Sequence, residues 1–175
     1  MRIRSLEPQD NEAIEKIIRQ CLTEFGGNRE GLAWADASLS DLYHFYRPAS
    51  SETDPASAGK AKAYWVAEEA GRVLGGCGIA PFAGSGEVCE LQKMYLLPEA
   101  RRTGAGSRLL RTALDFAERH YKACYLETLG SMAGAQRFYE KHGFRSLPAP
   151  LPGSEHYACD VWYIQELPVP SREIR

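Results

Sequence analysis

The chain contains 175 residues, of which 44% are hydrophobic and 25% charged, and its formal net charge is −2. This composition is typical of a soluble globular protein with one domain. We expect that domain to span residues 1–168, followed by a C-terminal tail at residues 169–175. So small a net charge indicates neither a nucleic acid nor a membrane surface as a partner, and the apolar runs are too short to span a membrane.

The N-terminus and the cysteines predict the compartment and the metal content. The first ten residues, MRIRSLEPQD, lack the apolar segment of a secretory signal. The five cysteines are widely spaced and include no C-x-x-C pair, which disfavours a disulfide framework and a zinc site. We therefore expect a cytoplasmic protein with no bound metal.

The first part of the chain shows helical periodicity. Apolar residues recur at helical spacing from Ile14 to Phe25, and Gly26-Gly27 ends the run. The predicted elements are, in chain order, a short strand at residues 3–6, a helix from about Asp10 to Phe25, a less regular helix at residues 39–46 and a polar surface loop at residues 49–61.

Strands alternate with helices only in the second part of the chain. The predicted elements there are strands at residues 63–69, 72–80 and 87–97, a helix that begins near residue 104, a strand at 123–128, a helix at 132–143 and a long final strand at 156–167. This order predicts a mixed α/β sheet and argues against a doubly wound parallel sheet.

Two arginines and two glycines stand together in the stretch PEARRTGAGSRLL, where the predicted helix begins. Such a helix start presents unpaired backbone N–H groups and the positive end of the helix dipole. Gly104 and Gly106 let a ligand approach the backbone, while Arg101, Arg102 and Ser107 add charge and a hydroxyl. The stretch suits a pyrophosphate group, although a solvated helix start with two surface arginines explains the same residues equally well.

Two common phosphate-binding loops do not fit this stretch. A P-loop ends in G-K-[ST], whereas this chain has Gly106-Ser107-Arg108. The dinucleotide-binding loop needs a third glycine where this chain has Leu109, and only Glu127 could supply its distant carboxylate. The residues of the loop alone therefore leave the ligand open.

With its surroundings, the stretch resembles the N-acetyltransferase superfamily related to the Gcn5 histone acetyltransferase (GNAT). Arg101, Gly104 and Gly106 match the family's pyrophosphate loop, [Gln/Arg]-x-x-Gly-x-[Gly/Ala]. Its second signature, Tyr-Glu-Lys-x-Gly-Phe at the end of a late helix, matches residues 139–144. One departure is Met132, because the family often has asparagine there, and the lost polar contact could move to Ser131.

The resemblance implies a mixed, mostly antiparallel central sheet of six or seven strands flanked by about four helices. It also implies an enzyme that transfers the acetyl group of acetyl-CoA to a primary amine of a small molecule or to an exposed protein amine. The cofactor-binding residues that it implies are Met94, Tyr95 and Leu96 for the pantetheine, and Arg101, Arg102, Thr103, Gly104, Ala105, Gly106 and Ser107 for the pyrophosphate.

Candidate catalytic residues follow from what the transfer needs. Glu90 is the candidate base because it interrupts an apolar strand just before the cofactor-binding residues. An ordinary strand carboxylate paired with Lys93 or Arg72 is the alternative, and Glu127 is a weaker candidate base. Tyr139 matches the family's usual acid, which protonates the leaving thiolate, although a buried core aromatic is the alternative.

The acceptor side is less specific. His156, Trp34 and Tyr64 are weak candidates for substrate binding, and simple packing is the alternative for the two aromatic residues. Two rival functions stay open, a non-catalytic acyl-CoA sensor and a nucleotide-binding regulatory domain. The predicted final strand could also help to form a homodimer.

Overall fold

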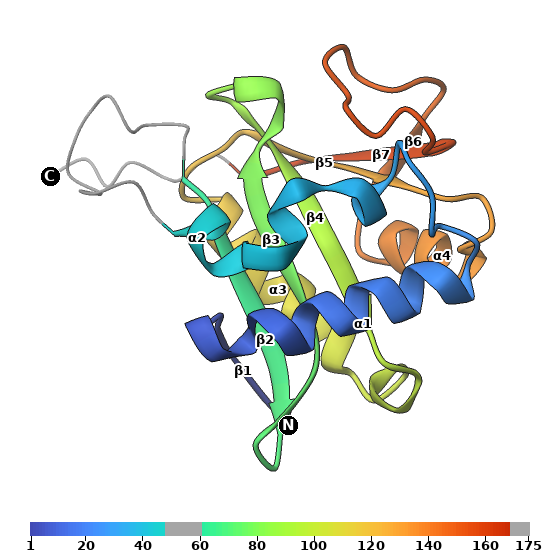
Figure 1. Ribbon diagram of the computed structural model, residues 1–175. Helices are drawn as coiled ribbons and strands as arrows, with labels where there is room; N and C mark the ends of the chain where they lie inside the picture. The colour runs from blue at the N-terminus through green and yellow to red at the C-terminus, as the bar shows by residue number, and fades with distance from the viewer. Residues whose placement is uncertain (48–60, 169–175) are drawn as a thin grey trace, which may run out of the picture.

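A computed structural model describes residues 1–47 and 61–168, so the predicted loop at 49–61, except for its last residue, and the predicted tail lie outside the described residues. Seven strands form one sheet in the order β1-β2-β3-β4-β5-β7-β6 (Figure 1). The strands are β1 (Arg2–Ser5), β2 (Ala63–Glu69), β3 (Arg72–Pro81), β4 (Val88–Leu96), β5 (Ala123–Thr128), β6 (Arg145–Leu147) and β7 (Val161–Glu166). The α-helices are α1 (Asn11–Glu24), α2 (Leu42–Tyr46), α3 (Ala105–Ala117) and α4 (Ala133–Lys141).

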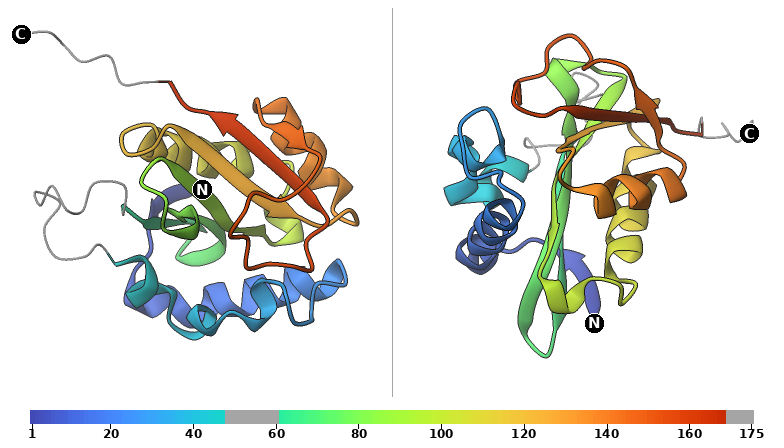
Figure 2. Two further views of the ribbon diagram at one scale, coloured as in Figure 1. Left: turned by 90° about the horizontal axis from the view of Figure 1, so that it is seen from above. Right: turned by 90° about the vertical axis from the view of Figure 1, so that its right-hand side faces the viewer.

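The helices cover both faces of the sheet. Helices α1 and α2 lie on one face, and α3 and α4 lie on the other (Figure 2). Each face has its own core, because every amphipathic helix buries one side against the sheet. The buried residues of α1 are Ile14, Ile17, Ile18, Cys21 and Leu22, and those of α3 are Ala105, Leu109, Leu110, Ala113, Leu114 and Ala117.

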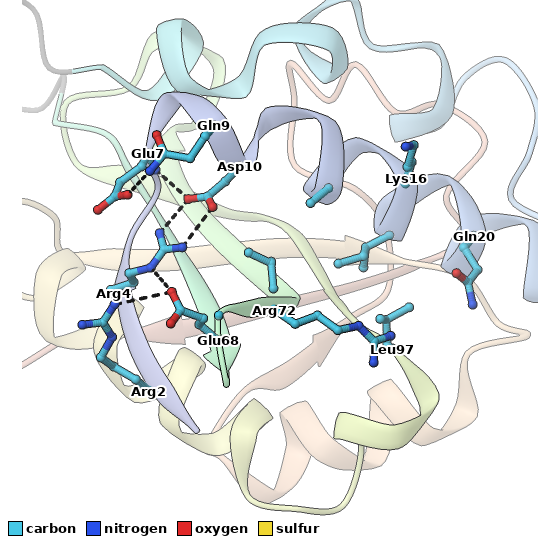
Figure 3. A pocket seen from close by; sticks show the side chains of 14 residues that line it. Arg2, Arg4, Glu7, Gln9, Asp10, Lys16, Gln20, Glu68, Arg72 and Leu97 are labelled. Carbon is cyan, nitrogen blue, oxygen red and sulfur yellow. Dashed lines mark hydrogen bonds and ion pairs between the residues drawn. The ribbon is translucent and has the colours of Figure 1, made fainter.

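A partly buried ion-pair network connects the N-terminus of α1 to the edge of the sheet (Figure 3). Arg4 on β1 donates to both oxygens of Asp10, at 2.6 and 2.9 Å, and to Glu68 on β2 at 2.5 Å. Asp10 also accepts from the backbone N–H of Glu7 at 2.8 Å. These contacts connect the edge strand β1 and its neighbour β2 to the beginning of α1.

Neighbouring strands are antiparallel, except that β4 and β5 are parallel. In this parallel pairing only Val88–Glu90 of β4 pair with Ala123–Tyr125 of β5. Beyond these residues β4 stays paired with β3, and β5 stays paired with β7. The two central strands therefore part halfway along the sheet.

A bulge in β4 lies at this parting. Gly78 faces Gln92 and Gly76 faces Tyr95, so two residues of β4 oppose Cys77. One of the two is Lys93, whose φ of 51° lies in the left-handed region. Bulges of this kind bend a strand and redirect its side chains.

Most of the predicted elements are confirmed, and the fold is the predicted mixed α/β sheet. The strands predicted at 63–69 and 123–128 have the observed bounds of β2 and β5. The helix predicted at 39–46 is instead a 3-10 turn at Ala37–Asp41 followed by the short α2.

The C-terminal prediction was wrong in two respects. The last strand begins at Val161, not at residue 156, because the preceding segment forms a loop in which the N–H of Ala158 donates to Gly31 rather than to a strand. The short strand β6 was not predicted. β7 pairs with β5 on one side and, over residues 162–164, with β6 on the other; the homodimer stays a prediction.

Candidate active site

A cavity opens where β4 and β5 part. Its walls come from both strands, from α1 and α4, and from the loops that precede α2 and β7. The lining residues are Leu22, Leu32, Ala33, Glu90, Leu91, Gln92, Lys93, Met94, Tyr95, Glu127, Thr128, Leu129, Met132, Ala135, Tyr139, His156 and Cys159. The predicted residues Glu90, Glu127, Tyr139 and His156 therefore meet in one place, whereas residues 101–107 do not line this cavity.

Glu90 lies at the last position where β4 pairs with β5 and is only 9% exposed. Burial raises the pKa of its carboxyl, although a hydrogen bond from Gln92 to its Oε2 at 2.6 Å opposes this shift. The predicted alternative partners are engaged elsewhere, since Lys93 pairs with Asp36 and Arg72 with Glu99. A buried carboxylate with a raised pKa is a better proton acceptor near neutral pH.

Glu127 on β5 faces Glu90 across the cavity. Its Oε1 accepts a hydrogen bond from the hydroxyl of Tyr125 at 2.8 Å. Its Oε2 is buried and has no hydrogen-bond partner among residues 1–47 and 61–168. A buried carboxylate oxygen without a partner is costly.

His156 links the cavity to a second charged group behind it. Its Nε2 lies 3.1 Å from Asp36, which also forms an ion pair of 2.5 Å with Lys93, and its Nδ1 lies 4.0 Å from Oε1 of Glu90. Burial alone would lower the pKa of His156, but the hydrogen bond and charge of Asp36 outweigh burial and raise it. Asp36 thus orients the ring so that Nδ1 is directed toward Glu90.

Tyr139 on α4 contributes a buried phenol to the same cavity. Its hydroxyl has no hydrogen bond within the part of the chain that the structure describes, and burial raises its pKa well above the usual range. The side chain packs at the edge of Phe144 and Tyr163. Tyr139 is therefore both a core aromatic, as the alternative had it, and a neutral proton donor at the cavity.

The predicted pyrophosphate loop precedes and begins α3. Arg102 and Gly104 adopt left-handed backbone conformations, with φ of 61° and 90°. The N–H groups of Gly104, Gly106 and Ser107 have no acceptor among the described residues, whereas Arg108 begins the helical hydrogen bonds by donating to Gly104. The loop thus presents several free N–H groups at a helix N-terminus, which is a favourable place for an anion.

The side chains of the loop differ in their availability. Arg101 donates to Glu24 through two nitrogens, both at 2.6 Å, and to the carbonyl of Leu96 at 2.9 Å, so it fastens the loop to α1 and β4. Ser107 lies 3.1 Å from Nε2 of His142. Arg101 was predicted as a direct ligand, and this placement instead favours a supporting role.

The remaining sequence candidates lie around the cavity. Trp34 is half-buried under the guanidinium of Arg19 and does not line the cavity. Tyr64 is buried, and its hydroxyl donates to the carbonyl of Lys93 at 3.0 Å, which supports the bulge. Met132 does line the cavity, while Ser131 is directed away and donates to the backbone of Phe25 at 3.0 Å.

Sequence reasoning missed Asp36 and Gln92, which orient His156 and Glu90. Asp36 lies 120 positions from His156, so no local pattern relates the two. Gln92 could have been found, because it follows Glu90 by two residues on one strand and side chains at that spacing share a face. Cys159 also lines the cavity, but burial raises its pKa to about 12, so it is a poor nucleophile.

A larger hollow of about 660 Å³ lies elsewhere, between α1 and the edge strands (Figure 3). Its charged side chains already have partners. Arg4 is held by Asp10 and Glu68, and Arg72 by Glu99. We interpret it as a structural groove and place the candidate active site at the parting of β4 and β5.

Taken together, the split sheet, the glycine loop at α3 and the buried phenol of α4 are the features expected of an acyl-CoA-dependent N-acyltransferase. Residues 14–144 match the Acetyltransferase (GNAT) family. The chain belongs to this family, as the two sequence motifs predicted, and is an acetyl-CoA-dependent N-acetyltransferase by class.

Individual relatives agree with this assignment. The chain is 40% identical over 168 residues to the uncharacterized N-acetyltransferase YjgM of Escherichia coli, covering 94% of each protein. In fold it is similar to a GNAT acetyltransferase of Staphylococcus aureus, with a TM-score of 0.75 and 22% identity over 95% of this chain and 99% of that one. It is also similar to the PaiA N-acetyltransferase of Thermoplasma acidophilum solved with coenzyme A, with a TM-score of 0.67 and 18% identity over 94% and 98% of the two chains.

Within residues 1–47 and 61–168, no helix is both long and apolar enough to cross a bilayer.

Proposed function

We propose that this enzyme transfers the acetyl group of acetyl-CoA directly to a primary amine, and that the transfer occurs in the cavity between β4 and β5. The observation that carries the proposal is that a buried carboxylate, Glu90, and a buried phenol, Tyr139, line this cavity. One can accept a proton and the other can donate one, which is what aminolysis of a thioester requires.

The donor would be bound along β4 and the loop that follows it. The free N–H groups of Gly104, Gly106 and Ser107 are the proposed ligands of the pyrophosphate. The pantetheine would lie beside Met94, Tyr95 and Leu96, where β4 has left β5. Backbone N–H groups of a parted strand can also stabilise the charge that develops on the thioester oxygen.

The acceptor must lose a proton before it attacks. An amine of pKa about 10.4 is neutral in roughly one molecule in 2,500 at pH 7, which corresponds to about 4.6 kcal/mol. We propose that Glu90 accepts this proton, that the nitrogen lone pair then forms the N–C bond, and that the C–S bond breaks. Tyr139 would give its proton to the leaving thiolate, and its phenolate would regain a proton from the nitrogen as the amide forms, while Glu90 would release the first proton to solvent.

The proposal is tested by measuring acetyl-CoA binding by calorimetry and release of free coenzyme A with a panel of primary amines. We expect calorimetry to show acetyl-CoA binding at a single site. We also expect at least one class of amine to cause release of free coenzyme A. Donor binding without turnover on any amine would support the acyl-CoA sensor instead. Stronger stabilisation by ATP than by acetyl-CoA would support the nucleotide-binding alternative.

A further inference from the structure

The first turn of α3 contacts the end of α4 through Ser107 and His142. Oγ of Ser107 lies 3.1 Å from Nε2 of His142, and Nδ1 of the same ring lies 2.8 Å from the carbonyl oxygen of Phe138. The rings of Phe138 and His142 pack with their centroids 4.3 Å apart, and a Cβ placed on Gly106 would lie 3.5 Å from the Phe138 ring. The end of α4 is therefore packed against the loop where the pyrophosphate is proposed to bind.

The hydrogen bonds of the His142 ring have determined directions. A carbonyl oxygen only accepts, so Nδ1 carries a hydrogen and donates to Phe138. In the neutral ring Nε2 is then an acceptor, and the hydroxyl of Ser107 donates to it. In the protonated ring Nε2 also carries a hydrogen and donates to Oγ of Ser107, which frees the hydroxyl hydrogen for another acceptor.

The freed hydroxyl lies among donors that suit a pyrophosphate. Ser107 is exposed, and its own N–H and those of Gly104 and Gly106 have no acceptor within residues 1–47 and 61–168. Phosphate oxygens are strong hydrogen-bond acceptors, so a hydroxyl that already donates to His142 adds nothing to their binding. A hydroxyl that accepts from the protonated ring adds one donor, and the ring adds a positive charge.

The surroundings of the pair favour a change of charge on the histidine. His142 is the C-cap of α4, where the helix dipole stabilises a cation. The two carboxylates on these helices have partners, since Asp115 pairs with Arg111 and Glu140 accepts from Tyr163. On β7, the neutral amide of Gln165 lies close to Gly143. The other charged side chains on the same stretches of α3 and α4 are Arg108, Arg137 and Lys141. Of these side-chain types, histidine is the one whose charge ordinarily changes between pH 5 and 8.

We propose that His142 is a positioning residue of the donor site, whose protonated ring frees the Ser107 hydroxyl to donate to the pyrophosphate of coenzyme A. The inference rests on the proposed function, because it adds a residue to the same donor site. When the ligand binds to protein whose ring is neutral, His142 takes up one proton from solvent and the hydroxyl of Ser107 reverses its direction. The donor is therefore bound more tightly at acidic pH.

The test is calorimetry with 3′-dephospho-coenzyme A. This ligand keeps the pyrophosphate and lacks the 3′-phosphate, a kind of group whose own second ionisation falls at about pH 6. We expect the affinity of the parent to be roughly 5-fold higher at pH 5.5 than at pH 8.0, which is about the value of one net hydrogen bond. Titrations in two buffers with different heats of ionisation should show net proton uptake on binding.

Four variants separate positioning from packing. His142→Gln and Ser107→Ala should each reduce the affinity ratio between the two pH values to less than about 2-fold. His142→Lys keeps a charged donor, so it should bind at pH 8.0 about as tightly as the parent does at pH 5.5. The matched control is His44→Gln, because His44 pairs with Asp41 on the opposite face of the sheet. This control should keep the ratio of the parent.

Equal affinities of the parent at the two pH values, or a ratio that His142→Gln preserves, would overturn the proposal. A ratio preserved in Ser107→Ala would also overturn it, because the ring would then act without the hydroxyl. Ser107 is exposed, so this second variant decides the question even where His142→Gln lowers the melting temperature. Failure of the parent to bind coenzyme A itself at either pH would contradict the proposed function.

Discussion

Among single residues, Glu90 has the environment that most clearly suits a catalytic proton acceptor. Burial raises the pKa of its carboxyl, so it takes up a proton at a higher pH than an exposed glutamate does. We expect kcat to fall on the acid side as Glu90 becomes protonated, with a midpoint above the usual glutamate pKa of about 4.3. Glu90→Gln should lower kcat by about 10²–10⁴-fold and remove this acid limb.

A pH profile of kcat from pH 5 to 9 measures this prediction. Glu87→Gln is the matched control, because Glu87 precedes the same strand but is exposed and paired with Lys122. The control should keep both the rate and the profile of the parent. An unchanged acid limb in Glu90→Gln would assign the titration to another group.

Tyr139 offers a second test at the residue scale. Its phenol is buried and stays protonated across the working pH range, so it can donate to the leaving thiolate. We expect Tyr139→Phe to lower kcat at least 10-fold with little change in acetyl-CoA affinity.

Tyr163→Phe is the matched control, because it removes a hydroxyl from a tyrosine that packs beside Tyr139. Tyr163 lies beside Tyr139, with ring centroids 6.3 Å apart, but its hydroxyl donates to Glu140. Its loss should affect stability more than turnover. Parent-like turnover of Tyr139→Phe from pH 6 to 9 would exclude the acid role.

At the scale of elements, the loop before α3 combines an unusual backbone with an open surface. Gly104 has a φ of 90°, and a Cβ placed on it would meet no atom within 4 Å. A left-handed conformation with this φ strongly favours glycine, and the open space is where the pyrophosphate is proposed to lie. We expect Gly104→Val to reduce acetyl-CoA affinity at least 10-fold.

Gly71 provides a matched control for backbone strain. It has a φ of 79° in the turn between β2 and β3, and its Cβ position is equally open. Gly71→Val and Gly104→Val should each cost about 1–3 kcal/mol of stability, but only the second should weaken acetyl-CoA in calorimetry. Equal affinities in the two variants would contradict the loop assignment.

The periodicity of apolar residues predicted the helices and strands well wherever local sequence determines the structure. The period-2 segments became β2 and β5, and the amphipathic segments became α1 and α3. Residues 156–160 look like the beginning of a strand, yet their backbone turns to meet Gly31 in a distant loop. Such a contact depends on the tertiary structure, which overrides local propensity.

The candidate site shows the same division. Glu90 and Tyr139 could be chosen from motifs and from their strand and helix positions, and both line the cavity. Asp36 could not, because it reaches His156 only after the chain folds. The ion pair between Arg101 and Glu24 was also hidden, since a motif gives the residue type and not its partner.

For the whole molecule, acid stability is the property to measure. Burial alone would raise the pKa of Asp10, but the hydrogen bonds from Arg4 and from the Glu7 backbone outweigh burial and lower it. A lowered pKa in the folded state stabilises the protein above the unfolded value of about 3.9, and this contribution is lost as pH falls through the folded pKa.

We therefore expect Asp10→Asn to cost about 1–3 kcal/mol near pH 7 and progressively less below pH 4. Urea unfolding between pH 2.5 and 7 measures the difference. Asp115→Asn, which removes an exposed pair with Arg111, should cost less than about 0.5 kcal/mol at every pH. A pH-independent cost in Asp10→Asn would contradict the assigned shift.

The strand order has a consequence for how the protein is made. β7 lies between β5 and β6 although it is synthesised after both. Until its residues leave the ribosome, β5 has an unpaired edge on the side away from β4, and β6 lacks the one strand with which it pairs among the described residues. The loop that carries His156 precedes β7 directly, so a nascent chain would complete its sheet and the cavity where β4 and β5 part in one late step. An exposed strand edge is prone to aggregate, and premature termination before Val161 is therefore expected to yield insoluble chains.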